Sequence, residues 1–387
     1  MPRLGLYGFA LAAAIVAAVA LWSGPARRPP DHQHAPGAPL LTAQPALPKP
    51  DQRALIESRA RTRTLTLTKA VGQLLIGTYA GVQPPPSILH DVRAGHLGGV
   101  ILMGANTAAG LAATHAATDT LQAAARAGGN PGLLIMTDQE GGEVKRLDGP
   151  PEYSAAGMAD VALARQQGTA TAQLLRQAGV NVDLAPVADV SRTDGFMTQE
   201  QRTFGSDGQG VARAACAFAR GLAAAGVAYT LKHFPGLGDA TQNTDGAPVG
   251  VAEPAGQIRG DDAPYRRCGR GPLALVMMSS ASYDRLTGST PAVLAPYIYR
   301  TVMKRDGIDA VTISDSFESG AISVQRSPAR AAINAGLDMV LYPGYEATSQ
   351  NAYDLLLQDA RAGTLHPGRV LAAAGRVLTL KANLGLG

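Results

Sequence analysis

The sequence GVAYTLKHFPGLGDATQNTDG, residues 226–246, decides the fold that we predict for this chain. Its first part, residues 226–231, is an apolar run that indicates a buried strand. The strand delivers Lys232 and His233, and a loop rich in glycine leads on to the carboxylate of Asp245. Such side chains at a strand end are typical of a site built on a rigid scaffold. Taken alone, the pattern fits an ordinary polar turn equally well, so the neighbouring elements must decide.

Seven further apolar runs accompany this strand along the chain. They lie at residues 72–79, 98–103, 132–137, 180–186, 273–278, 308–313 and 337–341. Stretches of helical composition, such as residues 161–178 and 209–225, separate them. Strands that alternate with helices pair in parallel through right-handed crossovers, and eight such units close into a barrel. We therefore predict an α/β fold, a single (β/α)8 TIM barrel over residues 61–387. A doubly wound dinucleotide-binding sheet is the weaker alternative, because no G-x-G-x-x-G follows an early strand.

The N-terminal residues have a different composition. Residues 4–22 are apolar and uncharged, and Arg3 precedes them. This is the pattern of an export signal, and the run is also long enough to span a bilayer. We expect residues 1–24 to be a signal peptide or an N-terminal membrane anchor, and residues 25–60 to be a disordered Pro/Ala-rich linker. The protein should then be exported, either secreted or held at the membrane by this segment alone, and residues 1 to about 55 should be dispensable for catalysis.

The composition excludes several classes of partner. The net charge is +4 and the pI about 9.1, without a basic cluster interleaved with aromatic residues, so we expect no nucleic-acid partner. The chain has no H-E-x-x-H, Cys/His cluster, P-loop or G-x-S-x-G, and we expect neither a metal nor a cofactor. We expect a monomer. Cys216 and Cys268 are the two cysteines; one disulfide and two separate thiols fit the sequence equally well.

Charged side chains follow several predicted strands at their C-terminal ends, where barrel enzymes carry their active sites. These residues are Asp138, Arg146, Arg202, Lys232, His233 and Asp315. Because these residues follow different strands, all of them should meet at the C-terminal end of the barrel, and this indicates a catalytic site. Carboxylates beside hydrogen-bonding cations suit polyhydroxylated ligands, and a carboxylate that attacks an anomeric carbon suits glycoside hydrolysis.

Five segments, in the same order along the chain, resemble glycoside hydrolase family 3, and within it the single-domain β-N-acetylglucosaminidases that trim bacterial peptidoglycan. The segments are GGVILMG at 98–104, DQEGG at 138–142, NVDLAPV at 181–187, KHFPGLG at 232–238 and ISD at 313–315. The resemblance implies that Asp315 is the nucleophile that forms a glycosyl-enzyme. It also implies a carbohydrate substrate whose sugar is bound by Asp138, Arg146, Arg202, Lys232 and His233.

The loop after Gly236 departs from the family pattern. Typical bacterial members carry Asp-Ser-His here, and that histidine is the acid/base. In this chain the three positions hold Asn243, Thr244 and Asp245. We therefore predict that Asp245 is the acid/base and that Asn243 holds it by a hydrogen bond. Asp239 is the second choice for the donor, and a mere turn-capping role for Asp245 is the alternative.

The resemblance implies a retaining exo-glycoside hydrolase that removes terminal β-linked N-acetylglucosamine from peptidoglycan fragments or related glycans. The altered loop keeps a second function open, a catalytically impaired sugar-binding protein of the cell envelope. A β-glucosidase or a phosphorylase on the same fold is a third. We expect structural roles for Glu140, Asp183 and Asp189 and for the histidines at 90, 96, 115 and 366.

Overall fold

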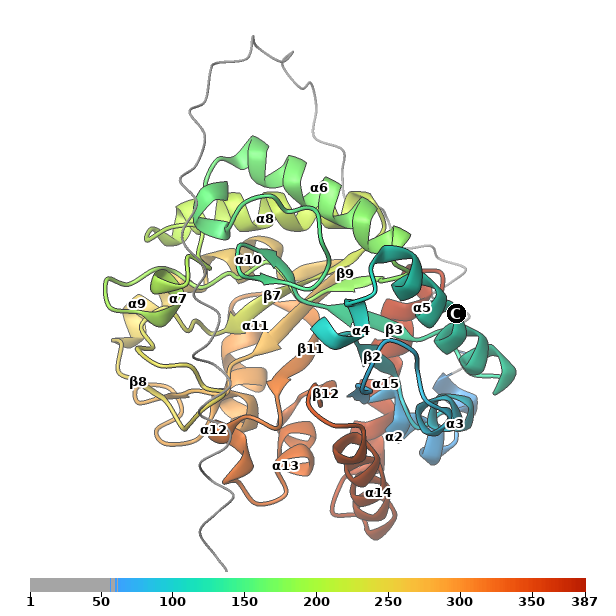
Figure 1. The fold of residues 1–387 in the computed structure, drawn as a ribbon. Helices are drawn as coiled ribbons and strands as arrows, with labels where there is room; N and C mark the ends of the chain where they lie inside the picture. Colours follow the sequence, from blue (N-terminus) through green and yellow to red (C-terminus); the bar gives the residue numbers. More distant parts are fainter. Residues whose placement is uncertain (1–55, 57–59, 61) are drawn as a thin grey trace, which may run out of the picture. The chain divides into compact units, whose positions relative to one another are not determined.

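The structure, a computed structural model, describes residues 56, 60 and 62–387. In this part of the chain, eight parallel strands form a closed barrel in the order β1-β12-β11-β9-β7-β6-β3-β2 (Figure 1). The strands are β1 (Leu75–Gly77), β2 (Gly99–Ile101), β3 (Leu134–Thr137), β6 (Val182–Asp183), β7 (Ala228–Phe234), β9 (Arg270–Met278), β11 (Asp309–Ser316) and β12 (Met339–Leu341). The predicted (β/α)8 barrel is confirmed.

Helices lie around the outside of the barrel (Figure 1). The longer ones are α2 (Leu67–Gln73), α3 (Pro86–Ala94), α5 (Leu111–Ala127), α6 (Val161–Gln177), α8 (Gly208–Ala224), α9 (Ala255–Asp261), α13 (Pro328–Ala335), α14 (Glu346–Ala362) and α15 (Pro367–Asn383). The shorter ones are α4 (Gly104–Thr107), η1 (Ala155–Met158), α7 (Phe196–Gln199), α10 (Ala263–Cys268), η2 (Ala292–Leu294), η3 (Ile298–Val302), α11 (Met303–Arg305) and α12 (Gly320–Ser323).

Two small sheets stand apart from the barrel. The antiparallel pair β4 (Gln139–Gly141) and β5 (Val144–Lys145) follows β3 directly. The parallel pair β8 (Gly250–Val251) and β10 (Ser282–Tyr283) joins the segments that follow β7 and β9. Both sheets therefore extend the loops that surround the C-terminal ends of the barrel strands.

The first predicted strand was placed too early. Residues 72 and 73 end α2, and β1 begins only at Leu75. The run from Ala70 to Ile76 is buried without interruption, and such a run does not distinguish a buried helix from a buried strand. The fourth strand is shorter than predicted, Val182–Asp183 in place of 180–186. Pro186 has no N–H for the ladder, which limits pairing at that end.

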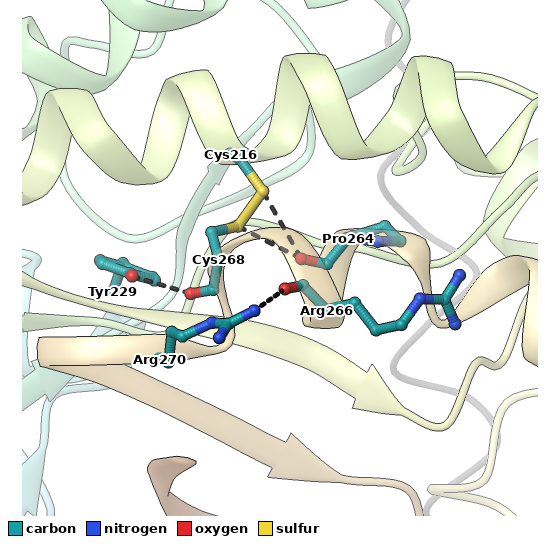
Figure 2. Close-up of a disulfide and its surroundings, with 6 residues drawn as sticks. All are labelled: Cys216, Tyr229, Pro264, Arg266, Cys268 and Arg270. Carbon is teal, nitrogen blue, oxygen red and sulfur yellow. Dashed lines mark hydrogen bonds between the residues drawn. A yellow bond between two sulfur atoms is a disulfide. The ribbon is translucent and has the colours of Figure 1, made fainter. Parts of the chain in front are cut away.

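A disulfide joins Cys216 of α8 to Cys268 at the end of α10 (Figure 2). Its sulfur atoms lie 3.5 and 3.4 Å from the carbonyl oxygen of Pro264. The hydroxyl of Tyr229 on β7 donates a hydrogen bond of 2.8 Å to the carbonyl of Cys268. The disulfide thus links two outer helices next to the strand that carries Lys232. The sequence left one disulfide or two separate thiols open, and the structure has the disulfide.

Among the described residues, no helix combines the length and the apolar character needed to cross a membrane. The signal peptide or anchor predicted at residues 1–24 lies outside the described residues, as does the linker predicted at 25–60 except for its residues 56 and 60.

Candidate active site

A cavity of about 310 Å³ opens at the C-terminal ends of the barrel strands. All seven side chains that the sequence analysis assigned to the site line it: Asp138, Arg146, Arg202, Lys232, His233, Asp245 and Asp315. Asp138 and Arg146 follow β3, Arg202 lies between β6 and α8, and Asp315 ends β11. The fold therefore brings residues that are far apart in the sequence to one place.

Lys232 is a buried cation held by two carboxylates. Its Nζ lies 2.8 Å from Oδ1 of Asp138 and 2.6 Å from Oε1 of Glu140. Burial alone would lower the pKa of Lys232, but the negative charges of Asp138 and Glu140 outweigh it and raise that pKa. Lys232 therefore stays charged and offers its remaining hydrogen to a ligand.

Glu140 belongs to the same cluster, although we expected only a structural role for it. Its carboxylate receives two hydrogen bonds from Arg202, of 2.9 and 3.0 Å. Burial would raise the pKa of Glu140, but Lys232 and Arg202 overcome this and lower it to about 2. Arg146 completes the cluster with an Nη2 that lies 3.7 Å from Oδ2 of Asp138. These five residues, Asp138, Glu140, Arg146, Arg202 and Lys232, form the charged floor of the cavity, a set of fixed charges that can bind hydroxyl groups.

The chain between β6 and β7 fixes His233. Asp189 is fully buried, and its Oδ2 lies 2.8 Å from Nδ1 of His233. Its Oδ1 accepts hydrogen bonds from the backbone N–H groups of His233 and Leu237, of 3.1 and 2.7 Å. A carboxylate at Nδ1 favours the tautomer with its proton there, so Nε2 is left for a ligand. Asp189 does not line the cavity and acts on the site through His233 and the backbone of Leu237.

Lys232 and His233 both line the cavity although they are consecutive residues of one strand. In a regular strand, successive side chains point to opposite faces. Here the pairing of β7 with β9 shifts register between Leu231 and Phe234, and the Lys232–His233 peptide bond is cis. The shift of register makes the strand irregular at Lys232 and His233, and both side chains line the cavity there.

Asp245 and Asp315 reach the cavity from different segments. Asp315 ends β11, and its Oδ1 accepts a hydrogen bond of 2.8 Å from the N–H of Ser316. Asp245 lies in the loop after β7, and the loop is bonded to the start of α12. Gly320 donates its N–H to the carbonyl of Asp245 at 2.8 Å, and Ala321 donates to that of Thr244 at 3.3 Å. These bonds hold Asp245 beside the segment that follows Asp315.

The surroundings of Asp245 favour its protonated form. Asp245 is exposed as a residue, but the protein atoms around its carboxyl partly desolvate it and raise its pKa first, and the negative charge of Asp315 raises it further. A hydrogen bond from the side chain of Asn243 acts in the opposite direction. Asn243 also accepts the backbone N–H of Asp245 at its Oδ1, 3.0 Å away. Asp239, the second choice for the donor, does not line the cavity.

Two other predictions concern residues outside the cavity. Asp183 is buried beneath the charged floor, and its Oδ1 accepts the N–H of Gln139 at 3.1 Å. Burial raises the pKa of Asp183 well above its usual value. The histidines at 90, 96, 115 and 366 do not line the cavity; His96, for example, stacks on Tyr353 with ring centroids 4.1 Å apart.

Carboxylates and hydrogen-bonding cations at the strand ends of a parallel eight-stranded barrel suit the hydrolysis of glycosides. The model of the family described as "Glycosyl hydrolase family 3 N terminal domain" matches residues 66–380. The chain belongs to glycosyl hydrolase family 3, and it is therefore a glycoside hydrolase.

Similar proteins carry related descriptions. The chain is 30% identical over 358 residues to "Beta-hexosaminidase LpqI" of Mycobacterium tuberculosis, covering 88% of this chain and 89% of that protein. It is 32% identical over 333 residues to an "Uncharacterized secreted glycosyl hydrolase" of Arthroderma benhamiae, covering 83% of this chain and 94% of that one. A solved family 3 β-N-acetylglucosaminidase from Paenibacillus sp. str. FPU-7 has a TM-score of 0.77 at 30% identity. That match covers 83% of this chain and 63% of the Paenibacillus chain, so this protein spans less than two thirds of it.

Proposed function

We propose that this protein is a retaining, exo-acting β-N-acetylglucosaminidase. It removes terminal β-linked N-acetylglucosamine from peptidoglycan fragments or related glycans and works outside the cytoplasm. The observation that carries the proposal is that Asp245 and Asp315 share one cavity with a floor of fixed charges. The similar proteins named as β-hexosaminidase and β-N-acetylglucosaminidase support the choice of sugar. The disulfide between Cys216 and Cys268 supports an oxidising compartment.

In the first step, Asp315 attacks the anomeric carbon of the bound sugar. The bond from this carbon to the leaving oxygen breaks, a bond to a carboxylate oxygen of Asp315 forms, and Asp245 gives its proton to the leaving oxygen. The raised pKa of Asp245 supplies the protonated form that this step needs.

In the second step, water attacks the anomeric carbon, the bond from this carbon to the oxygen of Asp315 breaks, and Asp245 takes a proton from the water, so that the Asp315 carboxylate is regenerated. Part of the upward shift in the pKa of Asp245 comes from the negative charge of Asp315. Esterification removes that charge, so the pKa of Asp245 falls when the residue must act as a base. A single carboxyl can therefore serve both steps.

The floor of the cavity binds the end of the sugar that is remote from the anomeric carbon. Asp138 accepts hydrogen bonds from hydroxyl groups, while Lys232, Arg146 and Arg202 donate hydrogen bonds to hydroxyl oxygens. His233 contributes Nε2, since its Nδ1 is occupied by Asp189. Fixed charges at this end, in a cavity of about 310 Å³, suit a single terminal sugar, which supports exo action.

The test is hydrolysis of p-nitrophenyl β-N-acetylglucosaminide by the purified protein. We expect activity on this substrate and on muropeptides, and a loss of about 10³-fold or more in Asp315→Asn, which lacks a nucleophile. Asp239→Asn, outside the cavity, is the matched control and should remain active.

Three results would redirect the assignment. Cleavage of the β-glucoside alone would make the sugar wrong. Sugar binding without turnover at any pH would favour the impaired sugar-binding protein. Formation of sugar 1-phosphate on addition of phosphate would favour a phosphorylase.

A further inference from the structure

Tyr345 is 75% exposed, more than any other large apolar side chain among the described residues. It lies at the N-cap of α14, two positions after Pro343, which lines the active-site cavity. The ring is therefore presented to solvent at the rim of a site for sugars. Leaving the apolar ring in water is unfavourable in free energy, and a polar side chain at this position would avoid that cost.

The backbone that carries this ring is fixed to the segment after the nucleophile. The carboxylate of Glu318 accepts the N–H of Gly344 at 2.5 Å and that of Tyr345 at 3.2 Å. A Cβ at Gly344 would lie 2.7 Å from Oε2 of Glu318, so a larger residue there would displace this carboxylate. Phe317 and Tyr342, which lie in the same two segments, pack edge to face with ring centroids 6.2 Å apart. Tyr345 thus has a fixed backbone position relative to Asp315.

The order of the strands places this rim next to the nucleophile and across the barrel from Asp138. In the closed barrel, β3 and β11 are four strands apart in either direction, and β12 is the neighbour of β11 (Figure 1). Asp138 follows β3, whereas Asp315 ends β11. A sugar bound by Asp138 at its remote end points its anomeric carbon across the barrel at Asp315. The leaving group then extends beyond Asp315, where the rim after β12, one of the two strands beside β11, holds the exposed ring of Tyr345.

We propose that Tyr345 is a platform for the leaving group, on which the sugar ring attached to the departing oxygen stacks. The proposal rests on the proposed function and adds a residue that determines specificity for the aglycone. An aromatic face offers a rigid apolar surface to the C–H face of a pyranose ring, while the tyrosine hydroxyl stays in water. A leaving group without a ring makes no use of this surface.

The experiment compares two substrates that differ only in the leaving group. N,N′-diacetylchitobiose releases a sugar ring, and β-N-acetylglucosaminyl fluoride releases a fluoride ion. We expect Tyr345→Ala to lower kcat/KM on the disaccharide by about 3- to 10-fold and to leave the fluoride unchanged. Tyr345→Phe, which keeps the ring, should restore the wild-type value. Tyr297→Ala removes another exposed tyrosine, 46% exposed and outside the cavity, and should change neither value.

Equal losses on both substrates, or no loss on either, would overturn the platform. If the wild type turns over neither substrate, the proposed function fails and the platform is judged by binding. Calorimetry on Asp315→Asn, with and without Tyr345→Ala, then compares the disaccharide with N-acetylglucosamine. A loss of about 3- to 10-fold for the disaccharide alone supports the platform, and any other result overturns it.

Discussion

At the scale of single residues, Asp245 has the most demanding role. Asp245→Ala should lower kcat/KM sharply with a poor leaving group, by about 10² to 10⁴-fold, and only slightly with an activated aryl leaving group that needs no proton. Hydrolysis of the glycosyl-enzyme still needs a base, so kcat with the activated substrate should fall, and azide should restore it because azide replaces water without needing a base. Equal, modest losses on both substrates and no azide effect would reduce Asp245 to the capping of a turn.

The pH dependence follows from the direction of the same pKa shift. Asp245 acts first as an acid, so the rate with a poor leaving group should fall as the pH rises through its raised pKa. Asp245→Ala should abolish this descending limb.

That Asp138, Lys232 and Asp315 meet at one cavity could be predicted, because each follows a strand whose apolar run is visible in the sequence. The pairs they form could not. Arg202 binds Glu140 across 62 positions of sequence, and the sequence offered no reason to prefer Glu140 over any other carboxylate. Glu140 lies two residues after Asp138, in the small sheet of β4 and β5, and this closeness to a predicted site residue was the signal that could have identified it.

At the scale of elements, the contact between the loop of Asp245 and α12 positions the two carboxylates. A Cβ at Gly320 would lie 2.3 Å from the carbonyl oxygen of Gly246. Gly320→Ala should therefore push the loop away from Asp315 and lower kcat by about 10-fold or more, since small misplacements of a catalytic group are costly. The loss should be largest with a poor leaving group.

Gly256→Ala in α9 is the matched control, because a Cβ there meets no atom within 4 Å. Wild-type kinetics are expected for it. Wild-type kinetics for Gly320→Ala as well would show that the contact with α12 does not position Asp245.

Element boundaries were harder to predict than element order. The eight strands appear in the predicted order, because each combines apolar residues with flanking turn signals. The boundary between α2 and β1 was missed because both elements are buried, and burial removes the polar residues that would reveal the periodicity.

At the scale of the whole molecule, the disulfide closes a long loop outside the active site. Cys216 and Cys268 are 52 positions apart, and in the chain-entropy model a loop of this length contributes about 4 kcal/mol to the free energy of unfolding. Cys216→Ser with Cys268→Ser should lower that free energy by a similar amount while the folded protein keeps its kcat. An unchanged midpoint of unfolding in denaturant would show that the disulfide does not contribute.

If Asp315 is the nucleophile, it becomes covalently bonded to the sugar, and a slow substrate should trap that bond. A 5-fluoro β-N-acetylglucosaminyl fluoride should glycosylate the protein faster than the ester hydrolyses, because the ring fluorine disfavours the charged transition state and fluoride leaves readily. Mass spectrometry should show one added glycosyl unit on the peptide that contains Asp315, and none on Asp315→Asn. Product release with no adduct at Asp315, or an adduct at another residue, would contradict the account.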